Sequence, residues 1–331
     1  MKYDVYGIGN ALVDKEFEVT DDFLAAEGIE KGLMTLIDEE RHNHLLASLK
    51  QNKGLKKRAG GGSAANSIVA ISQFGGKTFY ACKVANDEFG EFYMHDLHAA
   101  GVDTRLDQVR CISQGKTGKC MVMVTPDAER TMNTYLGITS DFSAAELHYE
   151  ELKQSNYLYV EGYLVTSDTS RAAVLAAREV AKQHGVKMAM TFSDPSMATY
   201  FKAGLVEMLG EGVDLLFCNQ DEAFAFTGQT HLNDAIRVLK PLARKLVVTL
   251  GSEGALVVNP DHEVKIAAQQ VTPVDTNGAG DMFAGAFLYG LTQGFNDEQA
   301  GALASKAAAR IIQVYGARLD KQIHQELLAA V

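Results

Sequence analysis

The chain has 331 residues, of which 47% are hydrophobic and 22% are charged, and its formal net charge is −11. This is the composition of a globular protein large enough to bury a core without disulfides or a structural metal. The acidic balance argues against a nucleic-acid-binding surface, and the chain holds neither a signal-peptide pattern nor an apolar run of about 18 residues. We therefore expect a cytoplasmic protein that binds neither nucleic acid nor a membrane.

The first 136 residues mix strands and helices without a regular order. The expected elements are a strand at 3–9, a mixed segment at 11–38 with a short helix at 22–27 and a strand at 33–37, a helix at 39–49, a polar connection at 50–58, a helix at 64–74, a strand at 78–84, a helix at 87–100 and a strand-rich segment at 104–136. The segments 15–37 and 104–136 are both poor in helix. We interpret them as a small β lid formed by two insertions into one α/β domain that spans 1–331.

From residue 157 onward, strands and helices alternate regularly. Strands are expected at 157–161, 187–192, 213–218, 245–250 and 255–258, and helices at 168–184, 221–227, 232–243, 280–292 and 297–314. Such alternation predicts an α/β fold with a doubly wound, mostly parallel sheet flanked by helices. Sheets of this kind bind their ligands at the carboxyl ends of the strands.

Cysteine usage fits an ordinary core. Cys82, Cys111, Cys120 and Cys218 each lie in or beside an apolar stretch, and no two of them form a CxxC pair. Their spacing suits neither a zinc site nor a disulfide framework. We expect these thiols to pack in the core.

Two nucleotide-binding patterns occur in incomplete form. Gly7-Ile8-Gly9 follows a strand, but Leu12 stands where a dinucleotide fingerprint has its third glycine. Gly115-Lys116-Thr117 has the end of a P-loop, but Arg110 stands where its first glycine should be. Neither pattern supports a binding site.

The histidine pairs do not indicate a metal site. His42 with His44, and His95 with His98, lie on predicted helices without further ligands at suitable spacing. We interpret these side chains as exposed on their helix faces.

One glycine-rich turn carries the strongest chemical signal. Asp275-Thr276-Asn277-Gly278-Ala279-Gly280-Asp281 opens a predicted helix. The free N–H groups of a helix start favour an anion, and glycine lets the backbone approach a ligand. Gly278, Ala279 and Gly280 could thus hold a phosphate while Asp281 takes a proton from an attacking hydroxyl. Taken alone, the turn could also be a tight connection with Asp281 as a helix-start charge.

Further polar segments fall where a doubly wound sheet places its ligands. Asn10 and Asp14 follow the first strand, Gly60–Asn66 precedes a helix, Asn219–Glu222 follows a strand, and Thr249–Gly251 ends another. Taken singly, Asp14 could be a turn residue, Asn66 a helix cap and Glu222 part of a solvated helix face. Their chemistry nevertheless suits a sugar, because a carboxylate and an amide can together bind a pair of hydroxyls.

Together these segments resemble the ribokinase-type sugar and nucleoside kinases of the PfkB family, over essentially the whole chain. The Asp275–Asp281 turn and the Gly61–Asn66 segment match its most specific signatures. Gly9–Asp14 and Ala59–Asn66 are most similar to the adenosine kinase-like branch. The resemblance implies a ribokinase-like fold with a β lid and an ATP-dependent phosphotransferase that acts on an alcohol group.

The resemblance also implies roles for individual residues on the substrate side. Asp281 matches the catalytic base, and Gly278, Ala279 and Gly280 match the anion hole. The residues that match the sugar-hydroxyl ligands are Asp14, Gly62 and Asn66, with Asn10 beside them.

On the nucleotide side, Asn219 and Glu222 match a motif that organises magnesium and phosphate, with Glu222 acting through water. Thr249 and Gly251 match the loop near ATP, and Asn277 matches a position near the nucleotide. The expected cofactors are Mg²⁺ and ATP as phosphate donor. A monovalent cation, bound by some relatives, is left open.

The function expected from this resemblance is transfer of the γ-phosphate to the primary (5′) hydroxyl of a nucleoside such as adenosine, or of a ribose-like sugar. The alternatives are a hexose or other carbohydrate kinase of the same family and a non-catalytic nucleoside or sugar sensor on the same fold. An NAD-dependent oxidoreductase is disfavoured by Leu12. Both a monomer and a homodimer are compatible with the sequence, because lid strands can pair between subunits.

Two assignments near the lid stay open. Met34, Met132, Tyr135 and Tyr163 could line an apolar slot for a base or sugar, or could belong to the core. Arg130 follows Asp127-Ala128-Glu129, and we interpret it as a turn cation in preference to a substrate contact.

Overall fold

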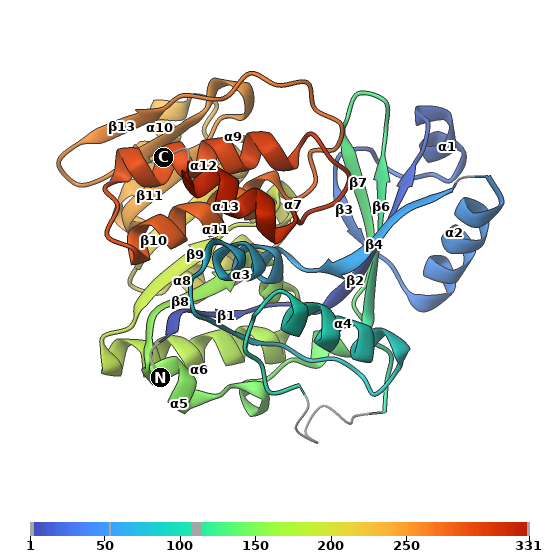
Figure 1. The fold of residues 1–331 in the computed structure, drawn as a ribbon, viewed down its shortest axis with the longest axis horizontal. Helices are drawn as coiled ribbons and strands as arrows, with labels where there is room; N and C mark the ends of the chain where they lie inside the picture. Colours follow the sequence, from blue (N-terminus) through green and yellow to red (C-terminus); the bar gives the residue numbers. More distant parts are fainter. Residues whose placement is uncertain (1–2, 53, 107–113, 330–331) are drawn as a thin grey trace.

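An eight-stranded sheet forms the centre of the larger of two bodies (Figure 1). The computed structural model describes residues 3–52, 54–106 and 114–329. The strand order is β13-β12-β11-β10-β9-β8-β1-β5, parallel from β11 to β5, with β12 and β13 antiparallel. The strands are β1 (Tyr3–Ile8), β5 (Thr78–Ala81), β8 (Ser155–Glu161), β9 (Lys187–Thr191), β10 (Val213–Asn219), β11 (Ala243–Thr249), β12 (Ala255–Val258) and β13 (Glu263–Ile266). The expected doubly wound sheet is confirmed.

Helices cover both faces of this sheet, because its strands are apolar on both sides. One face packs against α5 (Tyr149–Lys153), α6 (Asp168–His184), α7 (Pro195–Tyr200), α8 (Lys202–Leu209), α9 (Gln220–Thr227) and α10 (Leu232–Leu239). The other packs against α3 (Ser63–Phe74), α4 (Glu88–Ala99), α11 (Ala279–Thr292) and α12 (Asp297–Ile311), with α13 (Lys321–Ala329) lying on α3 and α12. Along β8, Leu158 and Val160 enter the first core and Tyr157 and Tyr159 the second.

Short 3₁₀ helices connect several of these elements. They are Gly137–Asp141, Ala144–Glu146, Gly162–Thr166, Lys240–Leu242 and Gly251–Glu253. None of the helices among the described residues is both long and apolar enough to cross a membrane.

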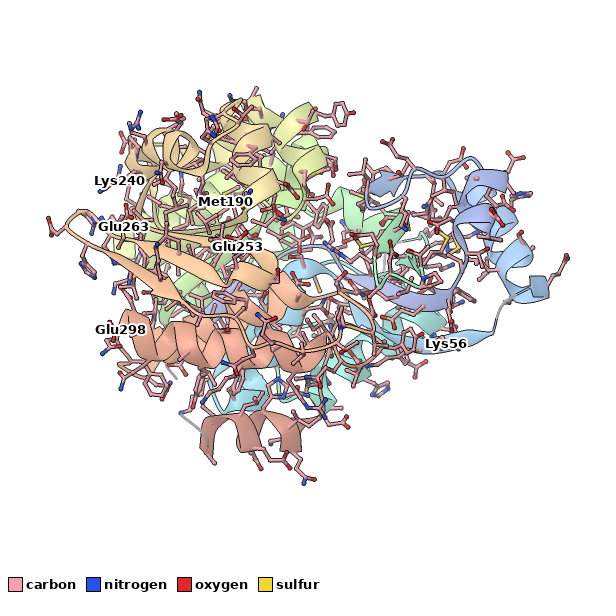
Figure 2. The ribbon with its side chains drawn as sticks, turned by 90° about the horizontal axis from the view of Figure 1, so that it is seen from above. Lys56, Met190, Lys240, Glu253, Glu263 and Glu298 are labelled. Atoms are coloured by element: carbon pink, nitrogen blue, oxygen red, sulfur yellow. The ribbon has the colours of Figure 1, made fainter. Side chains whose placement is uncertain are left out.

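A five-stranded sheet in the order β3-β7-β6-β2-β4 forms a second body beside the first (Figure 1). Its strands are β2 (Leu12–Glu18), β3 (Met34–Leu36), β4 (Leu55–Gly61), β6 (Gly118–Val124) and β7 (Arg130–Tyr135). We call this sheet, with α1 (Asp21–Ala26) and α2 (Glu39–Asn52), the small body. Figure 2 shows the two bodies from above, with Lys56 on the small one and Lys240, Glu263 and Glu298 on the large one.

The small body has one apolar face covered by its own helices. Phe17, Met121 and Met123 of the sheet pack against Leu45 and Leu49 of α2, and all five side chains are buried. The opposite face of the sheet carries alternate residues of the same strands and lies toward the large body. The small sheet is therefore one layer between α2 and the large body.

The structure differs from the expectations at identifiable places. The polar connection expected at 50–58 is wrong, because α2 continues to Asn52 and β4 begins at Leu55 and pairs with β2. The elements α5, α7, α8, α13 and β13 were not expected from the sequence.

Two side-chain expectations also need comment. His42 is 2% exposed and packs beside the ring of Tyr135, so the exposed assignment is wrong for this histidine; burial lowers its pKa. His44, His95 and His98 are exposed. Cys82, Cys120 and Cys218 are buried, as expected, while Cys111 lies outside the described residues.

Candidate active site

A cavity of about 530 Å³ lies where the two bodies meet, at the carboxyl ends of the central strands. The last residues of four adjacent strands line it: Glu161 of β8, Thr191 of β9, Asn219 of β10 and Thr249 of β11. Its volume is in the usual range for small-ligand sites. The positions expected from the sequence to form the site line this one cavity: Asn10, Asp14, Gly62, Asn66, Asn219, Glu222, Thr249, Gly251, Asn277, Gly278, Ala279, Gly280 and Asp281.

Asp281 sits in the first turn of α11 and is held by two donors from the start of α3. Ser63 Oγ donates to Asp281 Oδ1 at 2.6 Å, and Asn66 Nδ2 donates to Asp281 Oδ2 at 2.9 Å. Burial raises the pKa of Asp281, and the bonds from Ser63 and Asn66 oppose that rise. The carboxylate is thus fixed in orientation with its proton affinity increased, which suits a general base.

The start of α11 leaves room for a ligand in front of its backbone. Gly278 is the N-cap, with φ of 75°, and a Cβ atom there would lie 2.6 Å from Cα of Ala317. A Cβ atom at Gly280 would meet no heavy atom within 4 Å. Gly278 therefore needs its glycine for the turn, whereas the side of Gly280 opens onto free space. The N–H of Ala279 donates to the carbonyl oxygen of Thr276 at 3.3 Å. N–H groups left unpaired in such a first turn favour an anion.

Asp14 lines the cavity together with Asn10 and Gly62. Asp14 is on β2 in the small body, buried, and burial raises its pKa to about 7, while the positive charge of Arg318 opposes that rise. Gly62 has φ of 98°, and a Cβ atom there would lie 2.3 Å from the carbonyl oxygen of Asn10. Only glycine therefore lets the segment before α3 pass this close to Asn10.

Glu161 is a cavity residue that sequence reasoning missed. Its Oε1 accepts from the backbone N–H of Asn10 at 2.8 Å, and its Oε2 accepts from the N–H of Ala64 at 2.8 Å. One fully buried carboxylate thus joins the segment after β1 to the start of α3. Burial raises the pKa of Glu161 to about 7, against the effect of these two bonds. The only sequence signal was a carboxylate at the end of a predicted strand.

Asn219 and Glu222 form a capping box at the start of α9. The side chain of Asn219 accepts from the N–H of Glu222 at 2.8 Å, and Glu222 accepts from the N–H of Asn219 at 3.1 Å and from its Nδ2 at 2.9 Å. Glu222 is buried rather than part of a solvated helix face, and burial raises its pKa to about 8. A carboxylate held rigidly at a cavity wall can bind a hydrated divalent cation.

The turn Asp275–Asp281, which we call the signature turn, is hydrogen-bonded to the small body. The N–H and Oγ1 of Thr276 donate to the carbonyl oxygen of Ala128, at 3.3 and 3.0 Å, in the turn between β6 and β7. Asn277 Nδ2 donates to Glu16 Oε1 of β2 at 3.4 Å. Asn277 is buried and lines the cavity, yet its amide reaches across to the small body.

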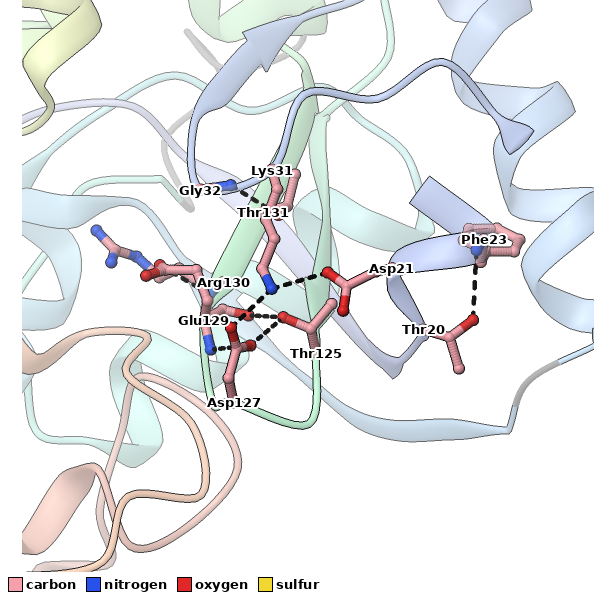
Figure 3. Close-up of polar contacts among 10 residues, drawn as sticks. All are labelled: Thr20, Asp21, Phe23, Lys31, Gly32, Thr125, Asp127, Glu129, Arg130 and Thr131. Carbon is pink, nitrogen blue, oxygen red and sulfur yellow. Dashed lines mark hydrogen bonds and ion pairs between the residues drawn. The ribbon is translucent and has the colours of Figure 1, made fainter. Parts of the chain in front are cut away.

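Arg130 at the start of β7 lines the cavity. Figure 3 shows its guanidinium extending away from the cluster in which Lys31 binds Asp21 and Asp127, at 2.8 and 2.7 Å. Its positive charge lowers the pKa of Asp281 and of Glu222. This placement contradicts the interpretation of Arg130 as a plain turn cation.

The inner face of the small sheet gives the cavity an apolar wall. Its lining residues are Leu12, Met34, Leu36, Cys120, Met132, Thr134 and Leu136. The Oγ1 of Thr134 already donates to Cys120 Sγ at 3.3 Å. Tyr163 also lines the cavity, whereas Tyr135 lies on the other face of the sheet beside His42. The expected slot thus includes Met34, Met132 and Tyr163 but not Tyr135.

Within the described part of the chain, no group of three or more His, Cys, Asp or Glu side chains is arranged to hold a metal ion by itself. The cavity instead offers the carboxylates of Asp14, Glu161, Glu222 and Asp281, of which the last three accept hydrogen bonds from protein groups. A magnesium ion that keeps several waters and also binds substrate phosphates fits such a donor set.

Comparison with known proteins agrees with this geometry. The profile of the pfkB family carbohydrate kinases matches residues 33–323. The structure of adenosine kinase from Sinorhizobium meliloti is 34% identical, with a TM-score of 0.94 and complete coverage of both chains. A probable sugar kinase from Rhizobium etli CFN 42 is 33% identical, with a TM-score of 0.94 and coverage of 100% of this chain and 99% of that one.

A curated relative extends the agreement to a eukaryote. Adenosine kinase from Saccharomyces cerevisiae is 28% identical over 328 residues, which cover 93% of this chain and 94% of the yeast protein. These likenesses span both bodies and the whole signature turn. The chain is a member of the pfkB family of carbohydrate kinases, and its enzyme class is that of the sugar and nucleoside kinases.

Proposed function

We propose that this kinase transfers the γ-phosphate of ATP to the primary 5′ hydroxyl of a nucleoside, with Asp281 as the base. The observation that carries the proposal is the position of Asp281 at the open N-terminus of α11, hydrogen-bonded to Ser63 and Asn66. A base and an anion-binding helix start then face the same free space. Phosphoryl transfer needs this kind of in-line positioning more than covalent chemistry.

The sugar would be held from both bodies. Asp14 can accept from two neighbouring hydroxyls, while Asn66 and Asn10 can donate and accept. These contacts would direct the primary hydroxyl toward Asp281. Asp281 would take the proton as the hydroxyl oxygen bonds to the γ-phosphorus and the bond from that phosphorus to the bridging oxygen breaks, so that ADP leaves. Asp281 is suited to this step because burial raises its pKa.

The nucleotide would lie on the other side of Asp281, along Thr249, Gly251 and Asn277. The amides of Gly278 to Gly280 would bind the transferring phosphoryl group, and Arg130 would add a positive charge from the small body. Glu222, positioned by Asn219, would hold Mg²⁺ through water. When bound, the metal neutralises phosphate charge. No residues are assigned to a monovalent cation.

The apolar wall favours a nucleoside over a free sugar. Met34, Leu36 and Met132 offer no hydrogen-bond partners, so the hydroxyls of a hexose would lose their hydrogen bonds there. A planar base can instead bury its faces against such side chains. The rival function is that of a carbohydrate kinase. The similarity to the probable sugar kinase from Rhizobium etli supports this second candidate.

The test is ADP release with Mg-ATP and a panel of adenosine, inosine, guanosine, cytidine, ribose and fructose, run on the wild type and on Asp281→Asn. We expect turnover on a nucleoside, and a loss of about 10²–10⁴ in kcat in the variant with substrate affinity retained. Turnover on free sugars alone would move the protein to the carbohydrate branch. Substrate binding without any phosphate transfer would favour the sensor, and near-normal turnover by Asp281→Asn would exclude Asp281 as base.

A further inference from the structure

Arg318 enters the site from a part of the chain that no motif singled out. It follows α12 in the loop Tyr315–Arg318, and its side chain is 9% exposed. Its Nε donates to Asn66 Oδ1 at 2.9 Å, and its Nη1 pairs with Asp96 Oδ2 of α4. Its Nη2 is buried and has no partner within the described structure. A buried guanidinium with one unpaired nitrogen calls for a functional explanation.

The bond to Asn66 determines which way that amide faces. An arginine can only donate, so it must meet the amide oxygen of Asn66. The amide nitrogen is then left to donate to Asp281 Oδ2, at 2.9 Å. Arg318, Asn66 and Asp281 thus form a chain in which each hydrogen bond polarises the next. The orientation of the base depends on a residue that does not touch it.

The loop that carries Arg318 is itself firmly held. Lys57 Nζ of β4 donates to the carbonyl oxygens of Tyr315 and Arg318, at 2.9 and 3.1 Å. The N–H of Gly316 donates to Asp275 Oδ2 at 2.9 Å. The loop is therefore tied both to the small body and to the signature turn, so the guanidinium can be placed reproducibly.

Arg318 also supplies positive charge in a cluster of carboxylates. Around Asp14 the charged groups are Arg318 from the loop, Asp281 from α11, Asp275 from the signature turn, Asp96 from α4 and Glu16 from the same strand. Arg318 lowers the pKa of Asp14, whereas Asp281, Asp96 and Asp275 raise it. Asp14 and Asp275 in turn raise the pKa of Glu16. A sugar diol needs Asp14 ionised, because only the carboxylate accepts from both hydroxyls.

We propose that Arg318 is a positioning residue for phosphoryl transfer: it fixes the amide of Asn66 toward Asp281. The proposal rests on the proposed function, because Asn66 and Asp14 are taken as sugar ligands. It predicts that sugar binding depends on Arg318 while nucleotide binding does not.

The test compares Arg318→Gln, Arg318→Lys and Asp96→Asn with the wild type, using the nucleoside that the substrate panel identifies. We measure kcat, the KM for nucleoside and for ATP, the pH profile of kcat/KM, and nucleoside binding by calorimetry without ATP. Arg318→Gln should raise the nucleoside KM and Kd about tenfold or more, as expected when a charge-assisted hydrogen bond is lost. The KM for ATP should change less than about twofold.

The pH profile separates charge from geometry. Without the positive charge, the acidic limb of Arg318→Gln should move to higher pH by about one unit or more. Arg318→Lys should restore that limb but not the KM, because an ammonium cannot reproduce the guanidinium fork. The Asp96→Asn variant keeps the hydrogen bond between Arg318 and Asn66. It should therefore leave the nucleoside KM within about threefold of the wild-type value.

Other outcomes would overturn the proposal in distinguishable ways. If Arg318→Gln binds and phosphorylates nucleoside like the wild type, Arg318 has no positioning role although the proposed function stands. Arg318 likewise has no positioning role if Asp96→Asn and Arg318→Gln lose activity equally, if both have a lowered Tm and if the pH profile does not move. Its role is then structural. If the wild type neither binds nor phosphorylates a nucleoside, the proposed function is wrong. The positioning role proposed for Arg318 is then wrong as well.

Discussion

At the scale of single residues, the site depends on glycines, because they have no Cβ atom and allow close packing around the cavity. Gly62 passes within contact distance of the carbonyl of Asn10, and Gly61 lies against Asp14, where a Cβ atom would come within 2.1–2.2 Å of the carboxylate. The glycine-rich segment therefore serves close packing around the cavity. In the signature turn, the glycines fall into two kinds that substitution can separate.

Gly278→Ala and Gly280→Ala form a matched pair for this distinction. Alanine at 278 meets Ala317 and a φ of 75°, so we expect a loss of more than about 1 kcal/mol in the free energy of unfolding. Alanine at 280 has free space and should leave stability unchanged or slightly higher. Its methyl group would occupy the space for the phosphoryl group, so kcat should fall on the order of 10².

Urea unfolding and steady-state kinetics on both variants check the pair. Equal stability of the two variants, or full activity of a stable Gly280→Ala, would contradict the separation of a turn glycine from a ligand-facing one.

How much of the site could be predicted depended on how local each signal was. Asp281 and Gly278 stand in one short motif, and Asn66 in another, so their place at the cavity could be expected from the sequence. Ser63 lies inside a motif but gave no signal of its own. Arg318 is 252 positions from Asn66, and no sequence pattern links the two, because only the fold brings the loop after α12 against α3.

At the scale of elements, those with local sequence signals were predicted, and those that depend on tertiary pairing were missed. α6 was expected within its observed bounds, because its apolar residues recur at helical spacing and Ser167 and Gly185 cap its ends. β4 was missed because residues 50–58, with the basic run Lys56-Lys57-Arg58, were expected to form a polar connection. Pairing with β2 makes this segment a strand, and Lys57 becomes a contact to the loop at Tyr315. Tertiary pairing overrides weak local preference in short strands.

The packing of α2 against the small sheet yields a stability prediction. Leu45 is fully buried against the apolar side of the sheet, so Leu45→Ala should lower the free energy of unfolding by roughly 2–5 kcal/mol. Lys50→Ala on the exposed face of the same helix should change it by less than about 0.5 kcal/mol. Urea unfolding followed by circular dichroism measures both. Equal effects would mean that α2 adds little to the small body.

At the scale of the whole molecule, several carboxylates are buried together between the two bodies. Burial raises the pKa of Glu16 to about 8, and those of Asp14 and Glu161 to about 7. Because these values exceed those of the unfolded chain, the folded protein binds more protons between about pH 4 and pH 8. The stability contributed by these groups is full below their ordinary pKa and is lost as pH rises through the raised values.

We therefore expect the Tm of the ligand-free protein to fall between pH 6 and pH 8.5. Glu16→Gln should flatten this decline, because Glu16 has an ordinary pKa of 4.5 and its buried Oε2 has no partner within the described structure. Glu298→Gln, on the exposed side of α12 (Figure 2), should decline like the wild type. Thermal melts across this pH range measure the Tm of the wild type and of both variants. A wild-type Tm that rises toward pH 8.5 would show that burial does not protonate these carboxylates.

Helix coverage of the small body also bears on assembly. α2 occupies the apolar outer side of the sheet that a second copy would need for face-to-face pairing. We expect a monomer with a mass near 35.9 kDa by light scattering across a range of protein concentrations. A species of twice that mass whose formation is abolished by substitutions on α2 would contradict this expectation.

The proposed sugar ligands are divided between the two bodies: Asp14 belongs to β2 of the small body, whereas Asn66 belongs to α3 of the large one. A bound sugar would therefore act as a reversible cross-link between them, near the points where the chain passes from one body to the other. Amide hydrogen exchange in β2 and β4 should slow once the sugar is bound. The second substrate would then meet a protein that is already ordered, so the two substrates would bind cooperatively even where they do not touch.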